Sequence, residues 1–279
     1  MQAPDGGSFV LVEVELQDDY PIPLTSVRSG YTQETEMVLH ADGRDYPLTG
    51  PGGLVLDPNR PFRQGGNVWV AVEGEPTDME VRVTVDGVTQ VVDTSDGSVD
   101  AGQAAGLADL PTPDELRQVP DISCGKPERL DSTGIEVTYR PHLDCLAQFT
   151  LRTPYVDGLG WAEPGREFFV LHMVRPSRLS LASGSGQDVT YWDSRVRFTA
   201  RLGGAEPVSP LANVNDLNEG TFTLQDPENP DQLVFDVAQG EPVGDLVFDL
   251  VVDATRGAPF VKEHRKLVFE WTIAGAELG

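Results

Sequence analysis

The sequence predicts an all-β protein made of two tandem antiparallel β-sandwiches, joined by a linker that contains one short helix. Many short apolar runs alternate with polar residues, and turn residues separate these runs. The 279-residue chain contains 29 glycines and 22 prolines, too many for a helical protein and too scattered for a low-complexity chain. The length corresponds to about two domains, each large enough to have its own core.

An internal repeat supports two copies of one module. Residues 69–86 and 235–253 each consist of a strand-like run, a Gly-Glu-Pro turn and a second run that ends at aspartate. Upstream, a glycine followed by four apolar residues at 6–12 corresponds to the same pattern at 165–171. The offsets of 159 and 166 to 167 are too long for a solenoid, so we expect tandem domains. The alternative is a chance likeness between two strand pairs.

The clearest strand signal is at 79–85, where apolar and polar residues alternate before Asp86-Gly87 and the run 88–92. Asp-Gly between such runs predicts a two-residue β-hairpin, because both turn positions need positive φ. Alternation at 196–202 and 267–273 predicts strands with one buried face. Further strands are expected at 8–16, 36–40, 67–73, 135–139, 145–153, 166–174, 220–225, 232–238 and 245–253.

We expect the first sandwich at 1–99, the linker at 100–120 and the second sandwich at 121–279. The linker is rich in Ala, Gly and Leu and is broken by prolines. Within it, Thr112 is suited to an N-cap and Pro113 to the first helical position, with acidic residues in the first turn. This order predicts the short helix, whose role would be to space or dock the two modules.

The first module is expected to be short of strands. In the second module about 30 residues (135–165) with two strand-like runs precede the matched Phe168, whereas eight residues precede its counterpart Phe9. An incomplete sheet leaves unpaired backbone groups along an edge, and another strand can pair with them. We therefore expect the edge beside 8–16 to be completed by a partner or by upstream sequence, through strand addition.

The charge is strongly acidic, with 45 acidic against 20 basic residues and a net charge of −25. Such a surface repels nucleic acid and anionic lipid, so neither is an expected partner. Acidity of this kind suits a cation, a basic partner or simple solubility, and solubility is the favoured interpretation. No apolar run approaches the roughly 18 residues of a membrane span, and the chain does not begin like an export signal.

Cys124 and Cys145 are the two cysteines of the chain. An even count without a Cys-x-x-Cys pattern favours one disulfide in an exported protein, which would stabilise the fold by about 3 kcal/mol. The alternative is two unrelated buried thiols.

The sequence contains no motif of a hydrolase, a nucleotide-binding protein or a zinc enzyme. The four histidines, at 40, 142, 172 and 264, are far apart and are expected to be strand or loop residues. Oxygen-bearing residues cluster on two loops and could bind calcium, although ordinary turns use the same residues and are the favoured interpretation. These candidate calcium ligands are Asp93, Asp96, Asp100, Asn215 and Asp216.

Aromatic residues at loop ends give a candidate binding surface. Tyr191 and Trp192 follow a Gly/Ser-rich loop, and Tyr20 precedes a proline-containing segment. Such residues can stack on a sugar or anchor a protein contact. More often they close the end of a sandwich core.

The run 155–162, followed by Gly165 and the apolar run 168–171, resembles the opening of immunoglobulin-like domains of unknown function carried by bacterial envelope lipoproteins. The resemblance covers about two thirds of each module and consists mostly of glycines and apolar strand residues. It implies an exported, non-catalytic immunoglobulin-like sandwich, and it has no catalytic residues to transfer to this chain.

The expected function is that of a non-catalytic binding or structural module at the cell envelope or outside the cell, which acts through protein contacts. A carbohydrate-binding accessory module with a calcium site is the alternative. An enzyme would need a concave site with convergent perturbed groups, and the sequence does not predict one.

Overall fold

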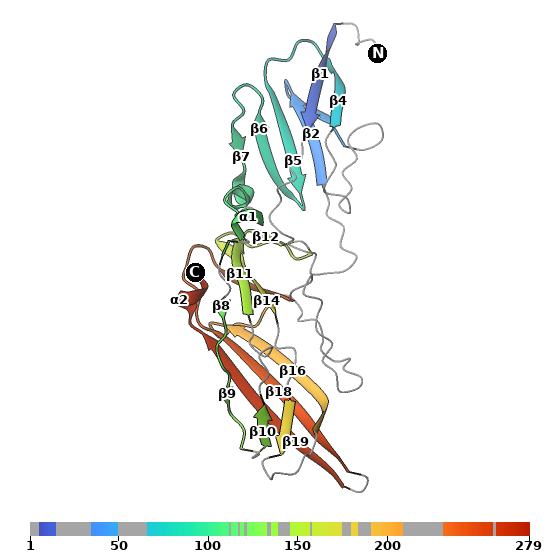
Figure 1. Ribbon diagram of the computed structural model, residues 1–279. Helices are drawn as coiled ribbons and strands as arrows, with labels where there is room; N and C mark the ends of the chain where they lie inside the picture. The colour runs from blue at the N-terminus through green and yellow to red at the C-terminus, as the bar shows by residue number, and fades with distance from the viewer. Residues whose placement is uncertain are drawn as a thin grey trace. The chain divides into compact units, whose positions relative to one another are not determined.

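The computed structural model shows a protein of antiparallel β-sheets, which confirms the all-β class (Figure 1). In the described part of the chain the helices are short, and none is long and apolar enough to cross a membrane. The structure describes residues 6–14, 35–49, 66–111, 113–116, 118–119, 122–132, 135–138, 146–156, 158–174, 180–183, 191–208, 231–258 and 261–279.

The chain divides into two compact units. Unit 1 comprises 1–116 and 153–164, and unit 2 comprises 117–152 and 165–279. The chain therefore passes from one unit to the other three times. Residues 153–164 belong to unit 1, although they lie within the second sandwich predicted at 121–279. The predicted domain boundaries themselves stay predictions.

Within its described residues, unit 1 has two antiparallel sheets that share a core. One pairs β1 with β4, and the other has the strand order β3-β2-β5-β6-β7, with β2, β5 and β6 side by side in Figure 1. Side chains from both sheets meet in one core, which includes Val10, Met37, Leu39, Val70 and Val81. The strands are β1 (Gly7–Val14), β2 (Thr35–Ala41), β3 (Arg44–Pro47), β4 (Gly66–Glu73), β5 (Met79–Val85), β6 (Val88–Asp93) and β7 (Val99–Asp100).

The predicted linker contains two helical segments rather than one. Helix α1 (Pro113–Leu116) begins at the predicted proline, while the 3-10 helix η2 (Gly102–Leu107) was not predicted. The proposed N-cap residue, Thr112, lies outside the described residues. Unit 1 also includes the short hairpin of β12 (Tyr155–Val156) and β13 (Gly160–Trp161).

Unit 2 has two four-stranded sheets, of order β17-β14-β11-β8 and β16-β18-β19-β9, and the strand pair β10-β15. The two larger sheets share one core, to which Phe169, Leu171, Phe235, Phe248 and Phe269 contribute. The elements are β8 (Ile122–Ser123), β9 (Glu128–Arg129), β10 (Ile135–Thr138), β11 (Leu146–Thr153), β14 (Arg166–Val174), β15 (Ser180–Ser183), β16 (Tyr191–Leu202), β17 (Asp231–Ala238), β18 (Leu246–Ala258), β19 (Val261–Ile273) and α2 (Gly275–Leu278).

The internal repeat is visible in the topology. In each unit the Gly-Glu-Pro turn leads from a strand of one sheet to a strand of the other, β4 to β5 and β17 to β18. The pair β1-β4 corresponds to β14-β17, because Val10 faces Val70 across the ladder as Phe169 faces Phe235. By this pairing, the offset between β1 and β14 is 159 residues and the offset between β4 and β17 is 165 residues. The offset between the two Gly-Glu-Pro turns is 166 residues.

The predicted hairpin at Asp86-Gly87 is confirmed, with φ of 45° and 83° at the two turn residues between β5 and β6. The same signal at Asp42-Gly43 was overlooked, although it joins β2 to β3 with φ of 44° and 79°. The strand predicted at 166–174 is present with those bounds as β14, and the other strands predicted in the described part of the chain are present with shifted ends. The strand predicted at 220–225 lies outside the described residues.

Candidate functional site

An exposed apolar pair lies on the outer face of the β1-β4 sheet. Leu11 and Trp69 are direct partners across the ladder, and 43% and 54% of their surfaces are exposed. Val10, Val12 and Val70, on the opposite face of the same strands, contact the core. The alternation of each strand therefore directs Leu11 and Trp69 to solvent, and we call this outer surface the β1-β4 face.

The corresponding face in unit 2 is covered. By the strand pairing, Leu11 corresponds to Val170 and Trp69 to Val234. Both of those valines have 0% exposure. Solvated large apolar side chains at positions that are buried in the other copy mark the β1-β4 face as a candidate binding surface.

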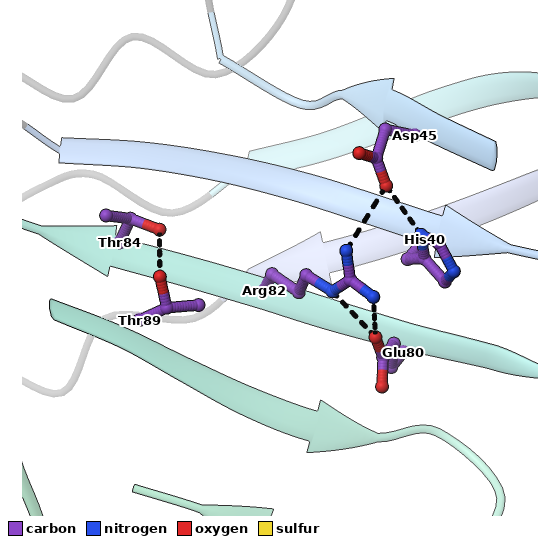
Figure 2. Close-up of polar contacts among 6 residues, drawn as sticks. All are labelled: His40, Asp45, Glu80, Arg82, Thr84 and Thr89. Carbon is purple, nitrogen blue, oxygen red and sulfur yellow. Dashed lines mark hydrogen bonds and ion pairs between the residues drawn. The ribbon is translucent and has the colours of Figure 1, made fainter. Parts of the chain in front are cut away.

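A polar network covers part of the other sheet of unit 1. Figure 2 shows that Asp45, on β3, lies between His40 on β2 and Arg82 on β5. Its Oδ1 lies 2.5 Å from His40 Nδ1 and 3.5 Å from Arg82 Nη1. Arg82 Nε donates to Glu80 Oε1 at 2.6 Å, and the hydroxyls of Thr84 and Thr89 lie 2.8 Å apart.

The network is suited to holding neighbouring strands of the sheet together rather than to catalysis. The hydrogen bond to His40 lowers the pKa of Asp45 from its ordinary value, and the positive charge of Arg82 acts in the same direction. A carboxylate with a lowered pKa is a weak base, and Asp45 is well exposed to water. The contact of Asp45 with His40 joins β3 to β2, and its contact with Arg82 joins β3 to β5 across β2. We therefore interpret the network as fixing the alignment of these strands.

His172, on β14, is a buried imidazole whose ring nitrogens have no hydrogen-bond partner among the residues that the structure describes. Its ring stacks on Phe149 of β11 with centroids 4.1 Å apart. Burial lowers the pKa of His172 to about 4. The side chain is therefore neutral at pH 7 and acts as an apolar residue of unit 2.

The predicted calcium ligands of unit 1 are used by their own turns. Asp93, Asp96 and Asp100 each accept a hydrogen bond from the backbone N–H two residues further along, at 2.7, 2.8 and 3.1 Å. The hydrogen bonds from Ser98 lower the pKa of Asp96. Among the described residues no three or more carboxylates, histidines or cysteines gather as metal ligands. This geometry matches the turn interpretation.

The remaining predicted site residues are described only in part. Asn215, Asp216 and Tyr20 lie outside the described residues. Tyr191 and Trp192 are the first two residues of β16, where their backbones pair with β18 opposite 256 and 255. Their role as a binding surface stays a prediction.

Cys124 is buried in the core of unit 2, with 4% exposure, and no free cysteine is found among the described residues. Cys145 lies outside them, so its pairing with Cys124 stays a prediction.

Sequence reasoning missed the β1-β4 face, although its signal was present. In the run 67–73, valines at alternate positions must face the core, which places Trp69 on the other side of the strand. Comparisons with protein-family models, curated proteins and solved structures find no match to this chain.

Proposed function

We propose that this protein is a non-catalytic binding module that acts through protein-protein contacts on the β1-β4 face. The observation that carries the proposal is the solvated cross-strand pair of Leu11 and Trp69. Tryptophan is enriched among the residues that dominate binding energy at interfaces. Phe9, which is half-buried on the same face, extends the apolar surface along β1.

The charge of unit 1 indicates the character of the partner. Residues 1–100 contain 18 acidic and 5 basic residues. The two arginines in the described strands of unit 1, Arg44 and Arg82, are already paired with carboxylates of the same unit. The remaining carboxylates would attract a basic partner and speed its association at low salt.

The proposal includes an immunoglobulin-like topology for both units and a location at the cell envelope or outside the cell. Its support is the resemblance of the segment that begins at Tyr155, together with two antiparallel sheets around one core in each unit. The predicted disulfide between Cys124 and Cys145 would suit an oxidising compartment.

A capture experiment with matched variants tests the proposed surface. The full chain, Trp69→Ser and Val99→Ser are each immobilised and exposed to an envelope extract, and the affinity of the captured protein is then measured after its purification. Val99 is the control because it is 58% exposed in the same unit but lies on β7, in the other sheet. Thermal unfolding establishes that all three proteins are folded.

We expect Trp69→Ser to weaken binding by about 30-fold, the effect of losing an interface residue worth about 2 kcal/mol. Val99→Ser should bind like the unaltered protein. Equal binding by the unaltered chain and Trp69→Ser would show that the β1-β4 face is not the contact surface.

A further inference from the structure

We propose that the edge of β1 at which no other described strand pairs accepts an extended strand of the partner, in the position that β11 occupies in unit 2. This inference rests on the proposed function and specifies how the partner binds. The added strand would have apolar side chains beside Phe9 and Leu11 and a basic side chain beside Glu13. The hydrogen-bond pattern of β1, the internal repeat and the charge of the edge support this mode of binding.

The hydrogen-bond pattern shows which backbone groups are directed to the edge. Gly74 N donates to Gly6 O at 3.0 Å, so residues 6 and 74 form a hydrogen-bonded pair of the antiparallel ladder. Such pairs alternate with pairs whose backbone groups are directed away from each other. The N–H and C=O groups of Phe9, Leu11 and Glu13 are therefore directed away from β4. Among the described strands, β4 is the only neighbour of β1.

Unit 2 shows the same edge occupied. Gln239 N donates to Gly165 O at 3.0 Å, which gives β14 the same alternation as β1 after the 159-residue offset. The groups of Phe168 and Val170 are thus directed away from β17. On that side β14 has a second neighbour, β11, so among the described strands this sheet has four members and the sheet of β1 has two.

The side chains of β11 indicate what an added strand would contribute. Phe149 stacks on His172, and Arg152 contacts Glu167 near the other end of β14, so the two strands run in opposite directions. Phe149 and Leu151 are buried. Because side chains alternate along a strand, Phe149 and Leu151 lie on the same face of β11. This is the face on which Phe149 contacts His172. A strand on β1 would therefore add apolar side chains to the β1-β4 face itself.

One position differs between the two edges and selects the charge of the strand. Where β14 has His172, β1 has Glu13, which is exposed. An aromatic residue stacked on this carboxylate would desolvate it, whereas lysine or arginine would pair with it. The excess of carboxylates in residues 1–100 favours the same choice. It disfavours a second copy of this chain, because each copy carries a net charge of −25.

Synthetic peptides based on β11 provide the probe. One has the sequence of 146–153, Leu-Ala-Gln-Phe-Thr-Leu-Arg-Thr, and the second has lysine in place of Phe149. Each is made in two N-methylated isomers. One isomer is methylated at the amides that would be directed to β1, and the other at the intervening amides. Fluorescence anisotropy of labelled peptide with the full chain gives the dissociation constants.

We expect the lysine peptide to bind about tenfold more tightly than the peptide with Phe149, and Glu13→Gln to remove this preference. Methylation of the amides directed to β1 should weaken binding by about tenfold or more, and methylation of the other set should have a much smaller effect. Leu11→Pro should abolish binding, whereas Leu11→Ala should only weaken it, because proline removes an edge donor and alanine does not.

Equal binding by the two N-methylated isomers would overturn strand addition. Failure of the lysine peptide to bind, while the unaltered protein still captures its partner through Trp69, would also overturn strand addition. The proposed function would be unaffected by that result. Concentration-dependent self-association in place of peptide binding would assign the edge to a second copy and also overturn the proposal. If Trp69→Ser instead bound the partner as tightly as the unaltered chain, the proposed function would be overturned.

Discussion

The hydroxyl of Tyr155 donates a hydrogen bond of 2.7 Å to Asp86 Oδ2, in the turn between β5 and β6. Trp161 Nε1 donates to the carbonyl oxygen of Val85, at the same turn and at the same distance. The two aromatic rings are 4.9 Å apart between centroids. The short hairpin of β12 and β13 is therefore anchored within unit 1 by residues 69 and 76 positions away in sequence.

Replacing Tyr155 by phenylalanine should destabilise unit 1. The change removes a hydrogen bond to an aspartate in a partly buried place, which costs about 1.5 kcal/mol. Tyr46→Phe is the matched control, because its hydroxyl makes weak contacts in an exposed place, a hydrogen bond of 3.4 Å from Glu73 N and a minor interaction with Arg44. Urea unfolding measures both variants. Equal free energies of unfolding for Tyr155→Phe and Tyr46→Phe would contradict the anchoring role.

Unit 2 should lose stability as the pH falls from 6.5 to 4. The folded state holds the pKa of His172 near 4, below the ordinary value of 6.5, because the ring is buried. The unfolded chain therefore takes up a proton first. The stabilising contribution is complete above pH 6.5 and decreases toward pH 4, by about 3 kcal/mol in total.

His172→Leu separates this effect from the titration of carboxylates, since it keeps an apolar side chain beside Phe149 and removes the ionisable ring. Free energies of unfolding measured from pH 7 to pH 4 should decline less steeply for the variant than for the unaltered protein. Parallel curves would mean that His172 is not protonated on unfolding in this range.

The disulfide prediction is tested by mass spectrometry of alkylated protein without reduction. We expect no alkylated thiol, because Cys124 and Cys145 are the only cysteines and would be joined. Reduction should then lower the free energy of unfolding by about 3 kcal/mol. Alkylation of both residues in folded, unreduced protein would exclude the bridge.

The strands of unit 1 could be predicted because the local sequence pattern of each one is sufficient to identify it. The alternation at 79–85 and the Asp-Gly turn after it define β5, β6 and their pairing without reference to the rest of the chain. The Gly-Glu-Pro turns identified the repeat, and both turns join strands of different sheets.

The candidate site could not be predicted in the same way. The run 155–162 contains the same residues whether it opens the second domain or joins unit 1, and long-range contacts such as that of Tyr155 with Asp86 decide between them. The exposure of Trp69 is likewise a property of the sheet, because alternation assigns it to a face but does not show whether that face is covered.

Amide hydrogen exchange along β1 shows whether the edge of this strand can accept a partner. If the edge is open, the amides of Phe9, Leu11 and Glu13 exchange much faster than those of Val10 and Val12, which pair with β4. Addition of the lysine peptide should then slow the fast set. Exchange of Phe9, Leu11 and Glu13 as slow as that of the central hairpin of β5 and β6, in the protein alone, would show that this chain already fills the edge and would contradict the account.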